Sequence, residues 1–535
     1  MFKGFLVIGV LASLLGTGRL SAQPWYNVMD YGAVNDSSAV VTDAVESAIA
    51  AAHEAGGGTV FFPAGRYLTG PIHLKSNITL HLEAGAELHF SDNFDHYLPM
   101  VPSRWEGTDV VNFSPLIYAN GAENIAITGR GTLNGNGKAW WTYFFDHIYG
   151  KDTTGNVSHW QREFFRLNAD VVAPDLPGWI EKGFLRPPFI QFMHCKDILI
   201  EGITIVNSPF WTVNPQYCEN VKINAVTINN PPSPNTDGIN PESCRNVHIS
   251  NCHISVGDDC ITIKSGKDRS GRLAAAPAEN YVITNCTMLR GHGGVVIGSE
   301  MSGDVRNITI SNCIFDGTHR GLRIKTARGR GGVVEGIRMG NIVMRDIKEH
   351  VIVLNMQYAK TEPEPVSERT PAFRDIHFSN ITAEGSGAIL LRGLSEMPIE
   401  DVSFYDVDIR AKTGLVVEHA RGIDATGLRL QTESGPVITA NDVDDFEISG
   451  FRGAAVVRDQ PVIRLTDVRE AFIHGATAAA GTDVFLQLEG AETGSVVLNN
   501  NRLHHAKQAV SAAGAIARNV TIDGAVYQGR SADEE

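Results

Sequence analysis

The sequence predicts an all-β fold, a right-handed, single-stranded parallel β-helix (a solenoid) with a short capping helix near its N-terminus. Three observations support this fold class. A short phrase recurs about every 23 to 29 residues through most of the chain. Apolar and polar residues alternate inside each copy, and turns rich in Gly, Asn and Pro separate the copies.

Each copy of the phrase has an apolar residue or Cys first, Asn, Asp or Gly third, and apolar residues at its fourth and sixth positions. The fourth and sixth side chains point to the same face of a strand, which we expect to be the inside of a coil. The copies lie at residues 195–200, 218–223, 244–249, 278–283, 305–310, 334–339, 373–378, 399–404 and 517–522.

Helix-free repeats of this length indicate coils that stack directly on one another. Equivalent positions then form columns, and the recurrent Asn at the turn can form a ladder of hydrogen-bonded side-chain amides. A leucine-rich repeat would need regular Leu spacing, which is absent. Propeller blades of about 40 or more residues are longer than the observed period.

The first coil of a solenoid exposes an edge that needs a cover. Residues 42–53 have the apolar spacing of a short amphipathic helix, with Thr42 or Asp43 as its N-cap. The glycines at 56–58 end it. We expect this helix to cover the first coil.

The N-terminus resembles a cleavable export signal, with Lys3 before an apolar run at residues 5–15 and cleavage after Ala22. We therefore expect residues 1–22 to be a signal peptide and the protein to be exported, to the periplasm or outside the cell. Residues 23–535 are expected to form a single β-helix domain. Its parts are an aromatic-rich insertion at 96–188, catalytic coils at about 190–360 and further coils at 361–535.

The insertion interrupts the repeat, and we expect its aromatic side chains to pack against one another more often than to stack on sugars. Its tryptophans are Trp105, Trp140, Trp141, Trp160 and Trp179.

Composition excludes some partners. The formal net charge of -15 argues against nucleic acid. No run after the signal approaches the roughly 20 apolar residues of a membrane helix, so no membrane association is expected. Several of the seven cysteines recur at one place in the repeat, which favours buried stacks over disulfides or a zinc site. They are Cys195, Cys218, Cys244, Cys252, Cys260, Cys286 and Cys313.

Four polar motifs occupy comparable late positions in successive coils, and stacking at about 4.8 Å per coil places them side by side. These are the tetrapeptides that begin at Asn235 (Asn-Thr-Asp-Gly), Gly257 (Gly-Asp-Asp-Cys), Gly291 (Gly-His-Gly-Gly) and Arg323 (Arg-Ile-Lys-Thr). Each alone could be a turn, a metal site or surface charge. Together, in this order and one coil apart, they indicate a functional site.

Cleavage of a glycosidic bond requires an acid that protonates the leaving oxygen and a carboxylate that activates water or attacks carbon. Asp237, Asp258 and Asp259 can supply both, because crowded carboxylates raise the pKa of at least one of them. His292 can adjust that proton balance. Adjacent Asp258 and Asp259 would point to opposite faces of a regular strand, so the backbone must bend or bulge there. The Arg323 motif supplies Arg and Lys for a uronate carboxylate.

At these motifs the sequence resembles glycoside hydrolase family 28, the polygalacturonases and their relatives, over about residues 24–360. The resemblance implies inverting hydrolysis with no metal or cofactor, with Asp258 as general acid and Asp237 and Asp259 holding and deprotonating the water. His292 would support the acid. The residues implied to bind substrate are Asn235, Arg323, Lys325 and Tyr358.

The implied activity is hydrolysis of α-1,4-galacturonosidic bonds in pectin or polygalacturonate, so the expected partner is an acidic plant cell-wall polysaccharide. Gly257 replaces a Gln of many endo-acting fungal members, and residues 264–272 resemble bacterial exo-acting members. Because the insertion could also block one end of the cleft, exo action is favoured. Three alternatives stay open: a rhamnogalacturonan or substituted-galacturonan hydrolase, a polysaccharide lyase with a Ca²⁺ cage, and a non-catalytic carbohydrate-binding solenoid.

Overall fold

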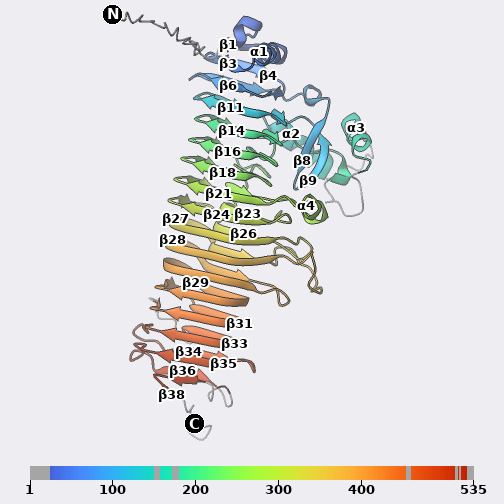
Figure 1. Ribbon diagram of the computed structural model, residues 1–535. Coiled ribbons are helices and arrows are strands. Elements are labelled where there is room, and N and C mark those ends of the chain that lie inside the picture. Colours follow the sequence, from blue (N-terminus) through green and yellow to red (C-terminus); the bar gives the residue numbers. More distant parts are fainter. Residues whose placement is uncertain are drawn as a thin grey trace, which may run out of the picture.

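The computed structural model describes residues 25–149, 157–170, 180–453, 460–512, 516 and 520–526. These residues form a long stack of coils whose strands pair almost entirely in parallel, as a right-handed β-helix does (Figure 1). The predicted fold class is therefore confirmed. The predicted signal peptide lies outside the described residues.

Three strands in most coils give the solenoid three faces. The first face runs from the N-terminus to the middle of the stack and carries the repeated phrase from residue 195 onward. Its strands are β1 (Trp25–Asn27), β3 (Gly58–Phe62), β6 (Ile78–Leu82), β11 (Glu123–Gly129), β14 (Lys196–Glu201), β16 (Glu219–Asn224), β18 (Arg245–Ser250), β21 (Ala278–Thr284) and β24 (Val305–Ser311).

The second face follows the first in each coil after a tight turn. Its strands are β2 (Asp36–Val40), β4 (Gly65–Thr69), β7 (Ala86–Phe90), β12 (Thr132–Asn134), β15 (Thr204–Val206), β17 (Thr227–Asn229), β19 (His253–Ser255), β22 (Thr287–Arg290) and β25 (Ile314–Asp316).

The third face holds the polar motifs. Single bridges at Val213 and Ile239 continue it between β13 and β20. Its strands are β5 (Ile72–His73), β10 (Ile117–Asn120), β13 (Ile190–Met193), β20 (Ile261–Ile263), β23 (Gly293–Gly298) and β26 (Arg320–Lys325).

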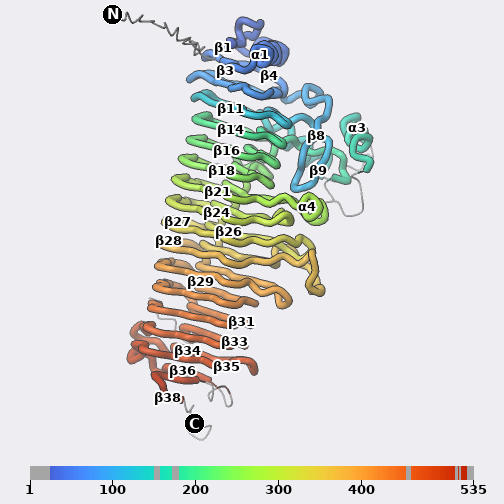
Figure 2. Tube along the Cα trace, in the orientation of Figure 1, coloured from blue at the N-terminus to red at the C-terminus, as the bar shows by residue number. Residues whose placement is uncertain are grey.

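Towards the C-terminus the corners smooth out and single strands run round more than one face (Figure 2). The long strands are β27 (Val333–Asn355), β28 (Ala372–Arg392), β29 (Ile399–Thr426), β31 (Ile438–Ser449) and β33 (Ile463–His474). The shorter ones are β30 (Arg429–Thr432), β32 (Arg452–Gly453), β34 (Val484–Glu489), β35 (Gly494–Asn499), β36 (Gln508–Ala512), β37 (Val520–Ile522) and β38 (Ala525–Val526).

Buried columns hold the coils together, as the alternating pattern predicts. Ile198, Val221, Val247, Tyr281 and Ile308 lie in register on successive coils and are at most 2% exposed. The cysteines also stack in the core, in one column of Cys195, Cys218 and Cys244 and another of Cys252, Cys286 and Cys313. All seven are buried free thiols, so the predicted stacks are confirmed.

A ladder of polar side chains runs along the beginnings of the first-face strands. Asp197, Asn220, Asn246, Asn280 and Asn307 all have positive φ, and each amide donates to the preceding side chain at 2.8 to 3.3 Å. Asn and Asp tolerate this left-handed conformation better than other residues with a Cβ. The predicted Asn ladder is therefore confirmed.

Helix α1 (Thr42–Glu54) covers the N-terminal end of the stack, as predicted (Figure 1). The predicted cap is wrong, because Val41 occupies the N-cap position and no side chain caps the helix. The Thr42 hydroxyl instead accepts a hydrogen bond from the Gly70 amide at 2.6 Å and so ties the helix to β4. No helix in the described ranges is long and apolar enough to cross a membrane.

The insertion packs beside the solenoid as an antiparallel hairpin, β8 (Val101–Trp105) and β9 (Thr108–Asn112), with several short helices. Trp105 and Trp140 are buried and pack on other aromatic rings, and Trp141 and Trp160 donate hydrogen bonds, so packing is their main role. Trp179 lies outside the described residues. The helices of the insertion are η2 (Phe94–Tyr97), α2 (Lys138–Tyr143), η3 (Phe144–Tyr149), α3 (His159–Leu167) and η4 (Ile180–Lys182). Outside it, η1 (Val28–Tyr31) lies against α1 and α4 (Asp268–Ala274) lies within the coils.

Candidate active site

Three of the motifs lie side by side where the chain enters the third face, as stacking predicts, whereas the Arg323 motif lies further along that face. The Gly238 amide donates to the carbonyl of Asp259 at 3.0 Å, and the His292 amide donates to the carbonyl of Asp258 at 2.8 Å. One coil further, β23 pairs with β26 so that Val296 lies beside Arg323. Residues nearly 90 positions apart in the sequence therefore become neighbours.

The three aspartates come together because the chain bends before β20. Residues 257–260 form this bend, so Asp258 and Asp259 do not alternate as they would in a regular strand. One carboxylate oxygen from each of Asp237, Asp258 and Asp259 lies within 4.8 Å of the others. Gly257 is required here, because a Cβ would lie 2.1 Å from the Ser233 carbonyl oxygen.

Asp237 is buried at the base of the cluster. Its carboxylate accepts hydrogen bonds from Asn240 at 2.9 Å and Thr262 at 3.2 Å. Burial and then the nearby Asp258 charge raise the pKa of Asp237 well above its ordinary value, although Lys264 opposes the rise. Asp237 therefore holds a proton more strongly than Asp258 does.

Asp258 forms a pair with His292, whose Nδ1 lies 3.1 Å from the Asp258 carboxylate. Burial acts to raise the pKa of Asp258, but the hydrogen bond and charge of His292, with help from Lys325, outweigh it, so this pKa is lowered. The same hydrogen bond raises the pKa of His292. The pair therefore shares one proton, which lies mainly on the imidazole.

Asp259 is bound by Lys325, whose ammonium lies 2.8 Å from one carboxylate oxygen. The other oxygen, Oδ1, is buried without a hydrogen-bond partner among the described residues. Tyr358 lies beside this pair, with its ring centre 5.4 Å from the Lys325 ammonium and 5.3 Å from the Arg323 guanidinium. An unpartnered buried oxygen is a place where a water or substrate group can bind.

These side chains surround a pocket of about 220 Å³. Of the residues predicted for the site, Asn235, the three aspartates, Lys325 and Tyr358 line it directly. His292 contacts it through Asp258. Arg323 is not among the lining residues; it lies on the same strand as Lys325, with its guanidinium 5.3 Å from the centre of the Tyr358 ring. The other lining residues are Glu106, Trp211, Lys264, Lys267, Ser299, Glu300 and Arg330.

A buried ion pair that the sequence did not predict forms one wall. The Lys264 ammonium lies 2.7 Å from Glu300 and 4.6 Å from the centre of the Trp211 ring. Burial opposes the charge of Glu300, but Lys264 outweighs it and holds the pKa of Glu300 well below its usual range. Both members of the pair are therefore charged, and the Lys264 ammonium is close enough to Asp237 to act against the rise of its pKa.

A second residue that the sequence did not predict, Arg186, holds the Asn235 turn. Its guanidinium is buried and donates to Asn235 Oδ1 at 2.7 Å and to the carbonyl oxygen of Pro234 at 2.8 Å. Because Oδ1 accepts this bond, the amide nitrogen of Asn235 is left to donate. Arg186 belongs to the predicted insertion, which therefore contributes directly to the site.

The β8–β9 hairpin covers the third face on the N-terminal side of the pocket. Ser103 donates to Gln191 at 2.6 Å, and buried Arg104 pairs with Glu242 at 2.9 Å. At the hairpin tip Glu106 lines the pocket and lies 3.6 Å from Lys267. The hairpin thus packs on the third face at Gln191 and Glu242, and its tip reaches the pocket.

The arrangement can hold a water or a cation, because three carboxylates converge. Lys325 already supplies a positive charge at 2.8 Å from Asp259, and Lys264 supplies another nearby. A proton shared by Asp258 and His292 beside two further carboxylates provides an acid and a base in one pocket. Fold and site together define the protein as a glycoside hydrolase.

Comparison with known proteins gives the family. Residues 180–443 match glycosyl hydrolases family 28, and residues 25–141 match a family described as rhamnogalacturonase A/epimerase, pectate lyase-like. A probable polygalacturonase of Vitis vinifera is 30% identical over 394 residues, covering 72% of this chain and 74% of that protein. The chain belongs to glycosyl hydrolases family 28.

Two further relatives have names that state a mode of action. An endo-polygalacturonase of Pectobacterium carotovorum subsp. carotovorum is 31% identical over 342 residues, covering 62% of this chain and 75% of that protein. The crystal structure of a hyperthermoactive exopolygalacturonase from Thermotoga maritima has a TM-score of 0.65 and 36% identity, covering 72% of this chain and 87% of that chain. The names of these relatives therefore include both endo and exo action.

Proposed function

We propose that the protein hydrolyses α-1,4-galacturonosidic bonds of polygalacturonate, releasing galacturonic acid from chain ends. The observation that carries this proposal is the aspartate cluster in a pocket that also contains cations. Lys325, Lys264, Lys267 and Arg330 line the pocket, each paired with a carboxylate, and their remaining N–H groups can donate hydrogen bonds to the carboxylate of a sugar. Several relatives are named polygalacturonases.

The proposed roles follow from where the protons lie. Asp258 protonates the leaving oxygen with the proton that it shares with His292. Asp237 and Asp259 hold the water, and Asp237 is a strong base once ionised because its pKa is raised. Asn235, Arg323, Lys325 and Tyr358 are the proposed substrate-binding residues.

Inversion at the anomeric carbon is the stereochemistry that the family resemblance implies. The carboxylate oxygens lie within 4.8 Å, closer than the roughly 6.5–9.5 Å between carboxyl groups of most inverting enzymes. In the proposed mechanism Asp237 and Asp259 both hold the water. A wide gap between one acid and one base is therefore not needed. Proton NMR of the first product tests this, because a β-anomer supports inversion and an α-anomer contradicts it.

Exo action is supported by the covered end of the pocket. A long chain cannot continue past the terminal sugar on the N-terminal side, where the hairpin buries Arg104 against Glu242. The pocket volume of about 220 Å³ is also below the range of about 300–1,000 Å³ typical of drug-sized ligand pockets. One sugar unit is therefore the proposed occupant.

The decisive experiment incubates the purified protein with polygalacturonate or rhamnogalacturonan and resolves the products by size over time. We expect monomeric galacturonate from the start with polygalacturonate only. A ladder of oligomers would refute exo action, and cleavage of rhamnogalacturonan alone would support the alternative that the match of residues 25–141 favours. Unsaturated products would indicate a lyase.

The Asp258→Asn variant is the matched control for catalysis. We expect it to lose activity by about 10²–10⁴-fold while still binding galacturonate oligomers. Unchanged activity would refute the assignment of Asp258. We also propose that the protein is exported, since its proposed substrate is an extracellular polysaccharide.

A further inference from the structure

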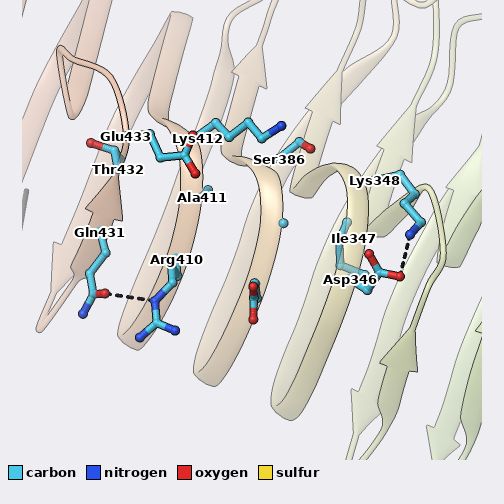
Figure 3. A pocket seen from close by; sticks show the side chains of 12 residues that line it. Asp346, Ile347, Lys348, Ser386, Arg410, Ala411, Lys412, Gln431, Thr432 and Glu433 are labelled. Carbon is cyan, nitrogen blue, oxygen red and sulfur yellow. Dashed lines mark hydrogen bonds and ion pairs between the residues drawn. The ribbon is translucent and has the colours of Figure 1, made fainter.

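A second hollow, the distal groove, lies on the same corner of the solenoid as Asp258 and His292 but nearer the C-terminus. Its volume is about 540 Å³. Four successive coils line it with residues 346–348, 384–386, 410–412 and 431–433 (Figure 3). The coils after the active site therefore contain a hollow larger than the active-site pocket itself.

Backbone hydrogen bonds show how the groove is aligned with the active site. The His292 amide donates to Asp258, the Arg320 amide to His292 and, one coil on, the Glu349 amide to His319, at 2.7 to 3.1 Å. Each bond links adjacent coils at the same corner. At about 4.8 Å per coil the groove begins about 14 Å from Asp258 and ends about 29 Å from it.

A bound polysaccharide is directed towards the groove, if the proposed function holds. The hairpin covers the coils on the N-terminal side of the pocket, so the chain that follows the terminal sugar must leave towards the C-terminal coils. A linked sugar unit is about as long as one coil spacing. Sugars a few units beyond the scissile bond therefore reach the distal groove.

The groove presents two cations that have no carboxylate partner in the described part of the chain. Among the described residues the exposed Arg410 donates to the neutral Gln431 at 3.0 Å, and it forms no ion pair with Glu384, its register neighbour on the preceding coil. The exposed Lys412 forms no ion pair with any residue that the structure describes, and it extends towards Ser386 (Figure 3). By contrast Arg392 is paired with Glu418 at 2.6 Å on neighbouring coils. A cation without an ion pair is available to donate hydrogen bonds to a carboxylate of a ligand.

The rest of the lining suits sugar hydroxyls. Glu384 and Glu433 are exposed and form no ion pair in the described ranges, so their carboxylates can accept hydrogen bonds, and Ser386 can donate or accept. Lys348 is neutralised by Asp346 at 2.5 Å. The groove therefore offers cations that can bind a carboxylate and, beside them, acceptors that can bind hydroxyls. This combination matches a uronic acid unit better than a simple anion.

We propose that the distal groove binds a uronate unit of the same polysaccharide chain, several sugars beyond the bond that is cut. Arg410 and Lys412 contact its carboxylate, and Ser386 and Glu433 contact its hydroxyls. The groove thereby holds long chains between successive cuts and gives them an advantage over short oligomers, which reach only the active-site pocket.

The test compares polygalacturonate with digalacturonate as substrates of Arg410→Gln/Lys412→Gln. We expect KM for the polymer to rise about tenfold with kcat unchanged, and both constants for the dimer to stay at the wild-type values. Lys412→Gln alone, which leaves the Arg410 to Gln431 bond intact, should show a smaller rise. The matched control is Arg429→Gln, since Arg429 is on the same coil as Gln431 but already paired with Asp406, and its constants should not change.

The outcomes separate the two proposals. KM for the polymer is measured at low salt on folded proteins with matching Tm. If the double variant and the wild type have equal values, the groove does not bind the polysaccharide, while cleavage of the dimer still supports the proposed function. A wild-type protein that cleaves neither substrate overturns the proposed function instead. An equal rise of KM for dimer and polymer also contradicts the groove, because the dimer does not reach it.

Discussion

Replacement of Arg186 by Met tests whether the insertion positions the substrate-binding turn. The buried guanidinium donates to the carbonyl oxygens of Pro209 and Pro234 and to Asn235 Oδ1, at 2.7 to 3.0 Å, and it packs 4.6 Å from the centre of the Phe144 ring. Burial lowers the pKa of Arg186 to about 9, so the group stays charged at neutral pH. Met keeps most of the packing and removes all three hydrogen bonds.

The size of the effect follows from those bonds. Two buried carbonyl groups lose their donor, at about 1–3 kcal/mol each, so the free energy of unfolding should fall by about 2–6 kcal/mol. Asn235 loses the partner that orients its amide towards the pocket. If one hydrogen bond from Asn235 to the substrate is lost, worth about 1.5–3 kcal/mol, kcat/KM should fall about 10- to 150-fold.

The assay is a double-mutant cycle on polygalacturonate with Arg186→Met, Asn235→Ala and both changes together. If Arg186 acts through Asn235, the double variant should be no worse than the poorer single variant, because the two changes remove the same interaction. The control is Arg104→Met, which removes an equally buried Arg that pairs with Glu242 rather than Asn235. The loss of kcat/KM in Arg104→Met should add to the loss in Asn235→Ala. Additive losses for Arg186→Met would refute the positioning role.

Three further predictions concern the pocket. Lys325→Met removes a charge that lowers the pKa of Asp237, so this pKa should rise further. Because the base must be ionised, the acidic limb of the pH profile of kcat/KM should move to higher pH. An unmoved limb would contradict this prediction. His292→Gln removes the proton shared with Asp258, so kcat should fall about tenfold or more. Binding of digalacturonate, measured by calorimetry, should be unchanged. A kcat equal to that of the wild type would exclude His292 as support for the general acid. Replacing the β8–β9 hairpin by a short turn should open the N-terminal side and yield oligomers as early products, whereas monomer alone would show that another element limits the enzyme to chain ends.

Sequence periodicity predicted the parts of the site that the coils themselves position. In a solenoid the register of one coil on the next is fixed, so the third position of a repeated phrase lies beside the third position of its neighbours. Asn220 and Asn246 bond for this reason, and so do Asp258 and His292. The bend that turns Asp258 and Asp259 to one side was also anticipated, because regular alternation could not place both in the cleft.

The insertion could not be predicted in the same way, because its position depends on side-chain packing and not on a repeat. No motif or repeat position marks Arg186 in the sequence, yet it is buried under the Asn235 turn. Glu300 likewise follows an ordinary strand and becomes significant only through Lys264 at 2.7 Å. An Arg among many aromatic residues is a weak signal that could have drawn attention to this segment.

The location of the proton is the part of the mechanism that most needs the structure. The sequence shows only that crowded aspartates must differ in pKa. Asp237 gains its raised pKa from burial beside Asp258, while Asp258 has a lowered pKa because His292 donates to it. A general acid that is ionised at rest can still protonate the leaving oxygen, because the imidazole 3.1 Å away supplies the proton as the bond breaks. His292 therefore supplies the proton that Asp258 transfers, and activity should fall at alkaline pH as the imidazole, whose pKa is raised by Asp258, loses that proton.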